Sequence, residues 1–153
     1  IKLDQGIVLL DTPGVLWPKL ENQHGGYRLA VTGAIKETAV SNDDIAMYAL
    51  AYLRDAYPES LKVRYQLTEL AEDDVTLLEA IGRKRGCLRS GGIVDLERAA
   101  KILLTELRAG ILGRVTLETP TMMEVELRAV DKKRELKAAK KKAKELKKAG
   151  MRI

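Results

Sequence analysis

An aliphatic run that leads directly into a tight turn, near the start of the chain, constrains the fold more than any other feature. Ile7–Leu10 holds four aliphatic residues, two of them β-branched, which predicts a short buried parallel strand. Asp11–Gly14 then lies at the carboxyl end of that strand, where α/β sheets bind their ligands. The order of strand, acidic residue and glycine predicts the edge of an α/β domain in the first residues.

The residue types of this D-x-x-G turn fit nucleotide chemistry. Asp11 can hold Mg²⁺ directly or through water, and Gly14 lets a backbone N–H approach a terminal phosphate. We expect Asp11, Thr12 and Gly14 to contact a nucleotide, although Asp-Thr-Pro-Gly is also good chemistry for a purely structural turn. Val15 stands where many GTPases place a water-positioning Gln, so we expect no catalytic residue in this chain.

Two other elements of a GTPase are absent from the sequence. Neither an Asn nor a Thr precedes a Lys-x-Asp motif for guanine, and the phosphate loop G-x-x-x-x-G-K-[S/T] does not occur. If the parent is a GTPase, both elements precede Ile1, and the chain begins inside a domain. An order with D-x-x-G last and a helical domain after it is typical of circularly permuted GTPases.

Helix signals dominate the rest of the chain. Capping residues at Ser41 and Asp95, and the acidic start Glu72–Asp74, each precede apolar residues at helical spacing. They predict helices over residues 41–57, 72–86 and 95–109, with a shorter one over 59–65, which can pack as a small bundle.

The segments between and beyond these helices give weaker signals. Residues 15–26 predict a loop, because they contain Pro18, Gly25 and Gly26, and residues 27–36 predict a short helix. Gly113–Glu118 alternates apolar and polar residues, which indicates a short strand or an extended segment. A last helix is predicted from about Asp131.

Positive charge is concentrated at the carboxyl end. Residues 132–153 hold 11 Lys or Arg and 2 Glu, a balance of +9, whereas residues 1–131 hold 16 basic and 20 acidic residues, a balance of −4. Such a block predicts an anionic partner, with nucleic acid ahead of a membrane surface because aromatic and bulky apolar residues are scarce. Lys140, Lys141 and Lys144 are the RNA-binding candidates here; a solvated helix is the alternative.

A second group of cations flanks a glycine-containing loop. Arg83, Lys84, Arg85 and Arg89 are candidates for contacts with the phosphates of a bent RNA backbone. Cations followed by a glycine are also what helix termination selects without any function.

Other function classes are excluded or disfavoured. No apolar run is long enough to cross a bilayer, so no membrane span is expected. Cys87 is the only cysteine, which rules out an internal disulfide, and no Cys/His cluster has zinc spacing. His24, the only histidine, is expected at the surface. A reducing, cytoplasmic compartment fits this composition.

Taken together, the motifs resemble the C-terminal part of the ribosome biogenesis GTPase A family of circularly permuted GTPases. The matching segments are Asp11–Lys19, Leu29–Lys36, Arg83–Gly92 and Gly113–Pro120.

The resemblance implies a parent enzyme that hydrolyses GTP during a late step of large ribosomal subunit assembly and touches ribosomal RNA with its helical domain. It implies GTP or GDP and Mg²⁺ as cofactors, with Asp11 on the metal side, Gly14 as donor to the γ-phosphate and the catalytic residue upstream of Ile1. The implied partners are the large-subunit precursor, ribosomal RNA and ribosomal proteins.

The expected fold is therefore mostly helical. A remnant of a P-loop-type α/β GTPase domain (residues 1–40) precedes a small α-helical RNA-binding domain (41–122) and a Lys-rich helical tail (123–153). The alternative is a stand-alone RNA-binding or protein-binding helical module with no nucleotide dependence.

Overall fold

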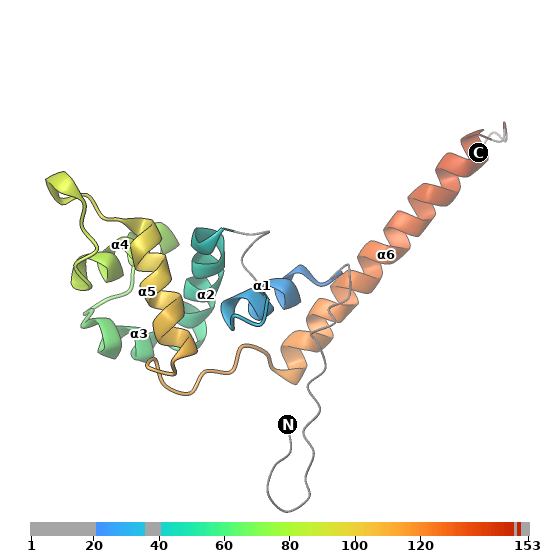
Figure 1. Cartoon of the computed structure of the whole chain (residues 1–153). Coiled ribbons are helices and arrows are strands. Elements are labelled where there is room, and N and C mark those ends of the chain that lie inside the picture. Colours follow the sequence, from blue (N-terminus) through green and yellow to red (C-terminus); the bar gives the residue numbers. More distant parts are fainter. Residues whose placement is uncertain (1–20, 36–40, 149, 151–153) are drawn as a thin grey trace, which may run out of the picture.

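The computed structural model describes residues 21–35, 41–148 and 150 (Figure 1). Within these residues there are six α-helices and no strand: α1 (Gln23–Val31), α2 (Asn42–Ala56), α3 (Pro58–Tyr65), α4 (Asp74–Lys84), α5 (Leu96–Arg108) and α6 (Pro120–Lys148). The prediction of a mostly helical protein is confirmed. The expected strand at Ile7–Leu10, and with it most of the α/β remnant, lies outside the described residues.

Three helices begin where the sequence places their caps. The side chains of Ser41, Asp73 and Asp95 each accept a hydrogen bond from the backbone N–H three residues later, at 2.8 to 3.2 Å. These bonds satisfy donors that have no partner within the helix, which fixes the first turns of α2, α4 and α5.

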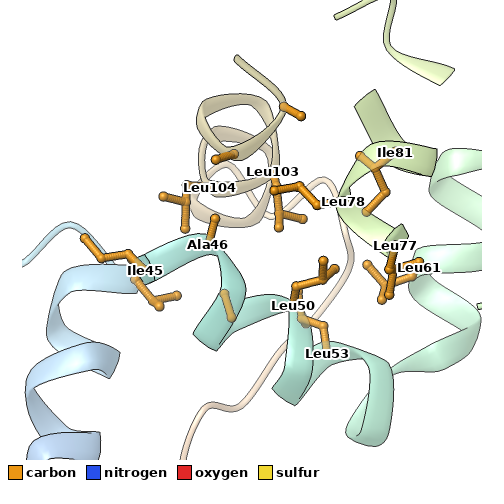
Figure 2. Packing of buried hydrophobic residues seen from close by; sticks show 14 of the residues in the cluster. Ile45, Ala46, Leu50, Leu53, Leu61, Leu77, Leu78, Ile81, Leu103 and Leu104 are labelled. Carbon is orange, nitrogen blue, oxygen red and sulfur yellow. The ribbon is translucent and has the colours of Figure 1, made fainter. Parts of the chain in front are cut away.

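One hydrophobic core holds the five shorter helices together. Helix α2 lies at its centre and packs against α1, α3, α4 and α5. Figure 2 shows its side chains meeting those of α3, α4 and α5: Ile45, Ala46, Leu50, Leu53, Leu61, Leu77, Leu78, Ile81, Leu103 and Leu104. Ala30 and Val31 of α1 belong to the same buried cluster, although they precede the predicted domain boundary at residue 40.

Helix α1 corrects the prediction for residues 23–26. These residues were expected in a loop, but α1 begins at Gln23 and includes Gly25 and Gly26. The side chain of Asn22 caps the helix by accepting a hydrogen bond from the N–H of His24 at 3.1 Å. At the other end, Arg108 of α5 donates to the carbonyl of Val31 at 2.9 Å. Capping and tertiary contacts thus outweigh the low helix propensity of two glycines.

Helix α6 also begins earlier than predicted, at Pro120 rather than near Asp131. Proline suits a first helical turn, and the Thr119 hydroxyl accepts a hydrogen bond from the N–H of Met122 at 3.2 Å. The helix leaves the body and projects away from it over most of its length (Figure 1). Among the helices that the structure describes, none is both long and apolar enough to span a membrane.

The segment between α5 and α6 is irregular, with bends at Arg114 and Leu117, so the strand considered for Gly113–Glu118 does not form. It is fixed to the body by tyrosines. The Tyr57 hydroxyl accepts a hydrogen bond from the N–H of Thr116 at 2.9 Å, and Tyr52 donates to the Thr116 carbonyl at 2.5 Å.

Candidate nucleic-acid interface

The nucleotide-contacting candidates lie outside the described residues. Asp11, Thr12 and Gly14 all precede Glu21, the first residue that the structure describes, and so does Val15, which stands in place of the catalytic Gln. In the described part of the chain, no group of three or more His, Cys, Asp or Glu side chains could hold a metal ion. The geometry of the site therefore concerns the predicted RNA contacts.

The end of α4 presents two exposed cations. Gly86 ends the helix with a φ of +66°, and the N–H of Cys87 returns to the carbonyl of Gly82 at 2.8 Å. This termination leaves Arg83 and Lys84 in the last helical turn, both exposed, and neither forms an ion pair within the described residues. Their charges are available to an anionic partner.

Arg85, in contrast, is packed into the body. Its guanidinium lies 5.1 Å from the centroid of the Tyr65 ring and 3.1 Å from Oε1 of Glu106. Tyr65 is fully buried, and the planar guanidinium covers the face of its ring. Arg85, at the end of α4, thus connects Tyr65 of α3 with Glu106 of α5, and part of its guanidinium remains exposed.

Glu106 contacts both Arg64 and Arg85. Arg64 of α3 donates to both of its carboxylate oxygens, at 3.0 and 2.6 Å. The hydrogen bonds from Arg64 hold the pKa of Glu106 below its ordinary value, against the opposing effect of burial. Through these two ion pairs, the Glu106 carboxylate of α5 is bound to α3 and to the end of α4.

Arg89 lies on a small protruding loop and is also paired. The loop is closed by a bridge between Leu88 and Val94 and by a hydrogen bond from the N–H of Arg89 to the Ile93 carbonyl at 2.8 Å. The Arg89 guanidinium contacts both carboxylate oxygens of Asp95 at 3.0 Å, and this contact lowers the pKa of Asp95. Arg89 thus stays on the surface in a fixed orientation.

Two further cations of α5, Arg98 and Lys101, were not predicted as contacts from the sequence. Both are exposed and follow Arg85 around a hollow beside the end of α4. The signal was present in the sequence as two basic residues three positions apart on the outer face of an amphipathic helix.

The tail lysines form a separate surface. Lys140, Lys141 and Lys144 are exposed on the distal part of α6, and Lys141 lies 3.9 Å from Glu145 in an exposed pair. Figure 1 shows that this part of α6 points away from α4 and α5, so the structure does not bring the two predicted sets of RNA contacts together.

The base of α6 is attached to α1. Arg28 is buried and pairs with Glu126, which also accepts a hydrogen bond from the Asn22 amide at 2.7 Å. Further along, Arg134 of α6 pairs with Glu21. The described part is thus a small helical module from which the basic helix α6 extends, and these ion pairs attach the base of α6 to α1 and to the residues just before it.

Comparison with curated proteins identifies relatives that are named as GTPases, most of them as ribosome biogenesis GTPase A. Ribosome biogenesis GTPase A of Bacillus cereus is 48% identical over 132 residues, which are 86% of this chain and 45% of that protein. Its namesake from Priestia megaterium is 49% identical over 124 residues, 81% of this chain and 43% of that protein. GTPase grn1 of Schizosaccharomyces pombe is 35% identical over 118 residues, 72% of this chain and 25% of that protein.

The chain is therefore a homologue of the C-terminal part of the ribosome biogenesis GTPase A proteins, and the resemblance predicted from its motifs is confirmed. It spans somewhat less than half the length of the bacterial relatives named above. A comparison with models of known protein families finds no match.

Proposed function

We propose that this chain is the nucleotide-sensing and RNA-binding C-terminal part of a cytoplasmic, circularly permuted GTPase that acts in late maturation of the large ribosomal subunit. The similarity to proteins named ribosome biogenesis GTPase A, over most of this chain, carries the proposal. In it, residues 1–40 complete a GTPase domain, residues 41–122 bind ribosomal RNA, and residues 123–153 are a basic extension.

The proposed mechanism is conformational. Asp11 holds Mg²⁺, Thr12 and Gly14 contact GTP or GDP, and the segment that follows Val15 responds to the γ-phosphate. The chain contains no phosphate loop and no guanine motif, so we expect these residues alone to be inactive and the catalytic group to lie upstream.

The position of α1 supports this coupling. Helix α1 starts only a few residues after the D-x-x-G turn, its buried face belongs to the core, and Arg28 attaches it to α6. A displacement at the start of α1 therefore acts on both predicted RNA-binding surfaces.

The RNA contacts are divided among two surfaces. Arg83 and Lys84 have uncompensated charges, whereas Arg85 and Arg89 are held in place by Glu106 and Asp95 and present their charges in fixed positions. Lys140, Lys141 and Lys144 supply a second, more extended set that neutralises phosphates without reading sequence. Ribosomal proteins of the large-subunit precursor are the further proposed partners.

A second candidate is an RNA-binding or protein-binding helical module that ignores nucleotide. The hydrophobic core favours it, because most of its buried residues belong to α2, α3, α4 and α5 and so lie outside the proposed GTPase domain.

The test is GTP turnover by the full-length parent with and without large-subunit particles. We expect turnover to be stimulated by the particles and to collapse in Asp11→Ala, while Asp43→Ala, which removes an exposed acid of α2, keeps wild-type turnover. A parent that ignores GTP, with an Asp11→Ala variant that still binds RNA normally, would establish the module without nucleotide dependence.

A further inference from the structure

A hollow of about 360 Å³ opens on the surface between the end of α4 and the outer face of α5. It is lined by three cations, one carboxylate, one hydroxyl and one aliphatic side chain: Arg85, Arg98, Lys101, Glu106, Thr105 and Ile102. Five of these residues, all except Arg85, belong to α5 and lie along one face of it, because they recur at intervals of three and four positions.

The carboxylate in this hollow is already neutralised. Glu106 receives hydrogen bonds from Arg64, which lies outside the hollow, and is 3.1 Å from Arg85. Because Arg64 neutralises the charge of Glu106, the net charge around the hollow is positive. It comes from Arg98, Lys101 and part of Arg85. The charged ends of these side chains therefore attract an anion, whereas the exposed surface inside the hollow is mostly apolar.

The donors around the hollow are free to turn to such an anion. Arg98 is exposed and forms no ion pair within the described residues. Lys101 pairs with Glu97 at 2.6 Å, but both side chains are more than half exposed. An exposed pair of this kind contributes little stability and exchanges readily for a better anion.

Arg83 and Lys84, the exposed cations in the last turn of α4, immediately precede Arg85 in the chain and add positive charge near this end of the helix. A row of cations over two helices fits a polyanion better than a single small ion, because successive phosphates can each meet a positive charge.

We propose that this hollow binds a backbone phosphate of RNA, held by Arg98 and Lys101 with Arg85 as a fixed third donor. The assignment rests on the proposed RNA binding and adds α5 to its contact surface. Arginine offers the fork of donors that suits a phosphate, and lysine adds a mobile point charge. The exposed Thr105 hydroxyl already donates to the Lys101 carbonyl at 2.7 Å, so we do not assign it a bond to the phosphate.

The experiment compares two full-length variants that each lose one arginine and one lysine. Arg98→Gln with Lys101→Gln removes the hollow's charges, and Lys62→Gln with Arg114→Gln removes the same charge from exposed or half-exposed positions on α3 and on the segment before α6. The probe is an RNA hairpin of mixed sequence, titrated at several salt concentrations, and thermal melting shows that both variants fold.

We expect the hollow variant to bind the hairpin about tenfold more weakly and to lose about one unit from the slope of log affinity against log salt, with the control close to wild type. Equal behaviour of the two variants, with RNA binding by the wild type intact, rejects the hollow alone. A wild type that binds no RNA rejects the proposed function as well. Displacement of the hairpin by inorganic phosphate at constant ionic strength, in wild type but not in the hollow variant, would assign the hollow to free phosphate instead.

Discussion

Arg28 of α1 and Glu126 of α6 form a bidentate ion pair between residues 98 positions apart in the sequence. Arg28 is 4% exposed, and its Nη1 lies 2.9 Å from Oε2 of Glu126. A buried guanidinium needs a counter-charge, which Glu126 supplies while it also accepts a hydrogen bond from the Asn22 amide. The pair therefore fixes where α6 leaves the body.

Glu126→Gln should loosen the base of α6. The substitution leaves the buried Arg28 without its main counter-charge, which we expect to weaken the docking of α6 on α1 by about 1–3 kcal/mol. Amide hydrogen exchange over residues 120–130 measures this as faster exchange. Glu124→Gln removes an exposed acid from the same turn and should leave exchange unchanged; equal protection in the two variants would contradict a role for the pair.

Glu106 should make the stability of the bundle depend on acid pH. Because hydrogen bonds from Arg64 lower its folded pKa below the ordinary 4.5, the carboxylate contributes stability fully above that value. This contribution is lost as the pH falls through the lowered folded pKa. Glu106→Gln should therefore unfold at a clearly lower denaturant concentration than wild type at neutral pH, and the difference should shrink towards zero in acid.

Urea unfolding of both proteins at a series of pH values, from neutral pH down into acid, measures this change. Glu97→Gln is the matched control, since it removes an exposed glutamate from the same helix. A Glu106→Gln variant whose deficit persists unchanged in acid would show that the charge of Glu106 is not the cause.

Gly82 should tolerate no side chain. A Cβ there would lie 2.6 Å from Cγ1 of Val94 and 3.1 Å from the Cβ of Ala99, where α4 meets α5 and the protruding loop. We expect Gly82→Ala to lower the free energy of unfolding by about 1–3 kcal/mol through overpacking. Gly25→Ala meets no atom within 4 Å and should instead leave stability unchanged or raise it by about 0.4–1 kcal/mol. Denaturant unfolding that gives both substitutions the same sign would contradict this packing.

The local parts of this fold are readable from the sequence because their causes are local. Ser41, Asp73 and Asp95 cap helices through bonds to backbone groups three residues away, so a short motif contains the whole interaction. Apolar spacing likewise predicts which side of α2 is buried, because the helix packs on that side against several neighbours.

The errors arise where distant residues decide. Gly25 and Gly26 indicate a break, but Asn22 caps α1 and Arg28 binds a glutamate from the far end of the chain. The early start of α6 is a different kind of error, because its cause is local: Thr119 caps a helix that begins at the adjacent Pro120.

The candidate site shows the same division. Arg83 and Lys84 are exposed as their position in a last helical turn predicts. The partners of Arg85 and Arg89 could not be read from their neighbours: Glu106 belongs to another helix, and Asp95 is opposite Arg89 only because a loop closes between them. Arg83, Arg85 and Arg89 are therefore equivalent candidates in the sequence, but in the fold only Arg85 and Arg89 have carboxylate partners.

The tail lysines should control the salt dependence of RNA binding. Lys140, Lys141 and Lys144 are exposed on a helix that projects from the body, so their substitution by Gln should not affect the core. Affinity of the full-length protein for an RNA hairpin should fall at low salt. The slope against log salt should flatten by up to about three units, since each lysine that no longer neutralises a phosphate removes about one unit.

The opposite change in charge provides the control for the tail. Glu135→Gln with Glu145→Gln makes the same helix more positive, and the second substitution also frees Lys141 from its exposed pair. If the tail binds phosphates, this variant should bind RNA more tightly than wild type and with a steeper salt slope, since two repulsive charges are gone. If both tail variants keep the wild-type slope, α6 is a solvated helix and the RNA contacts belong to the body alone.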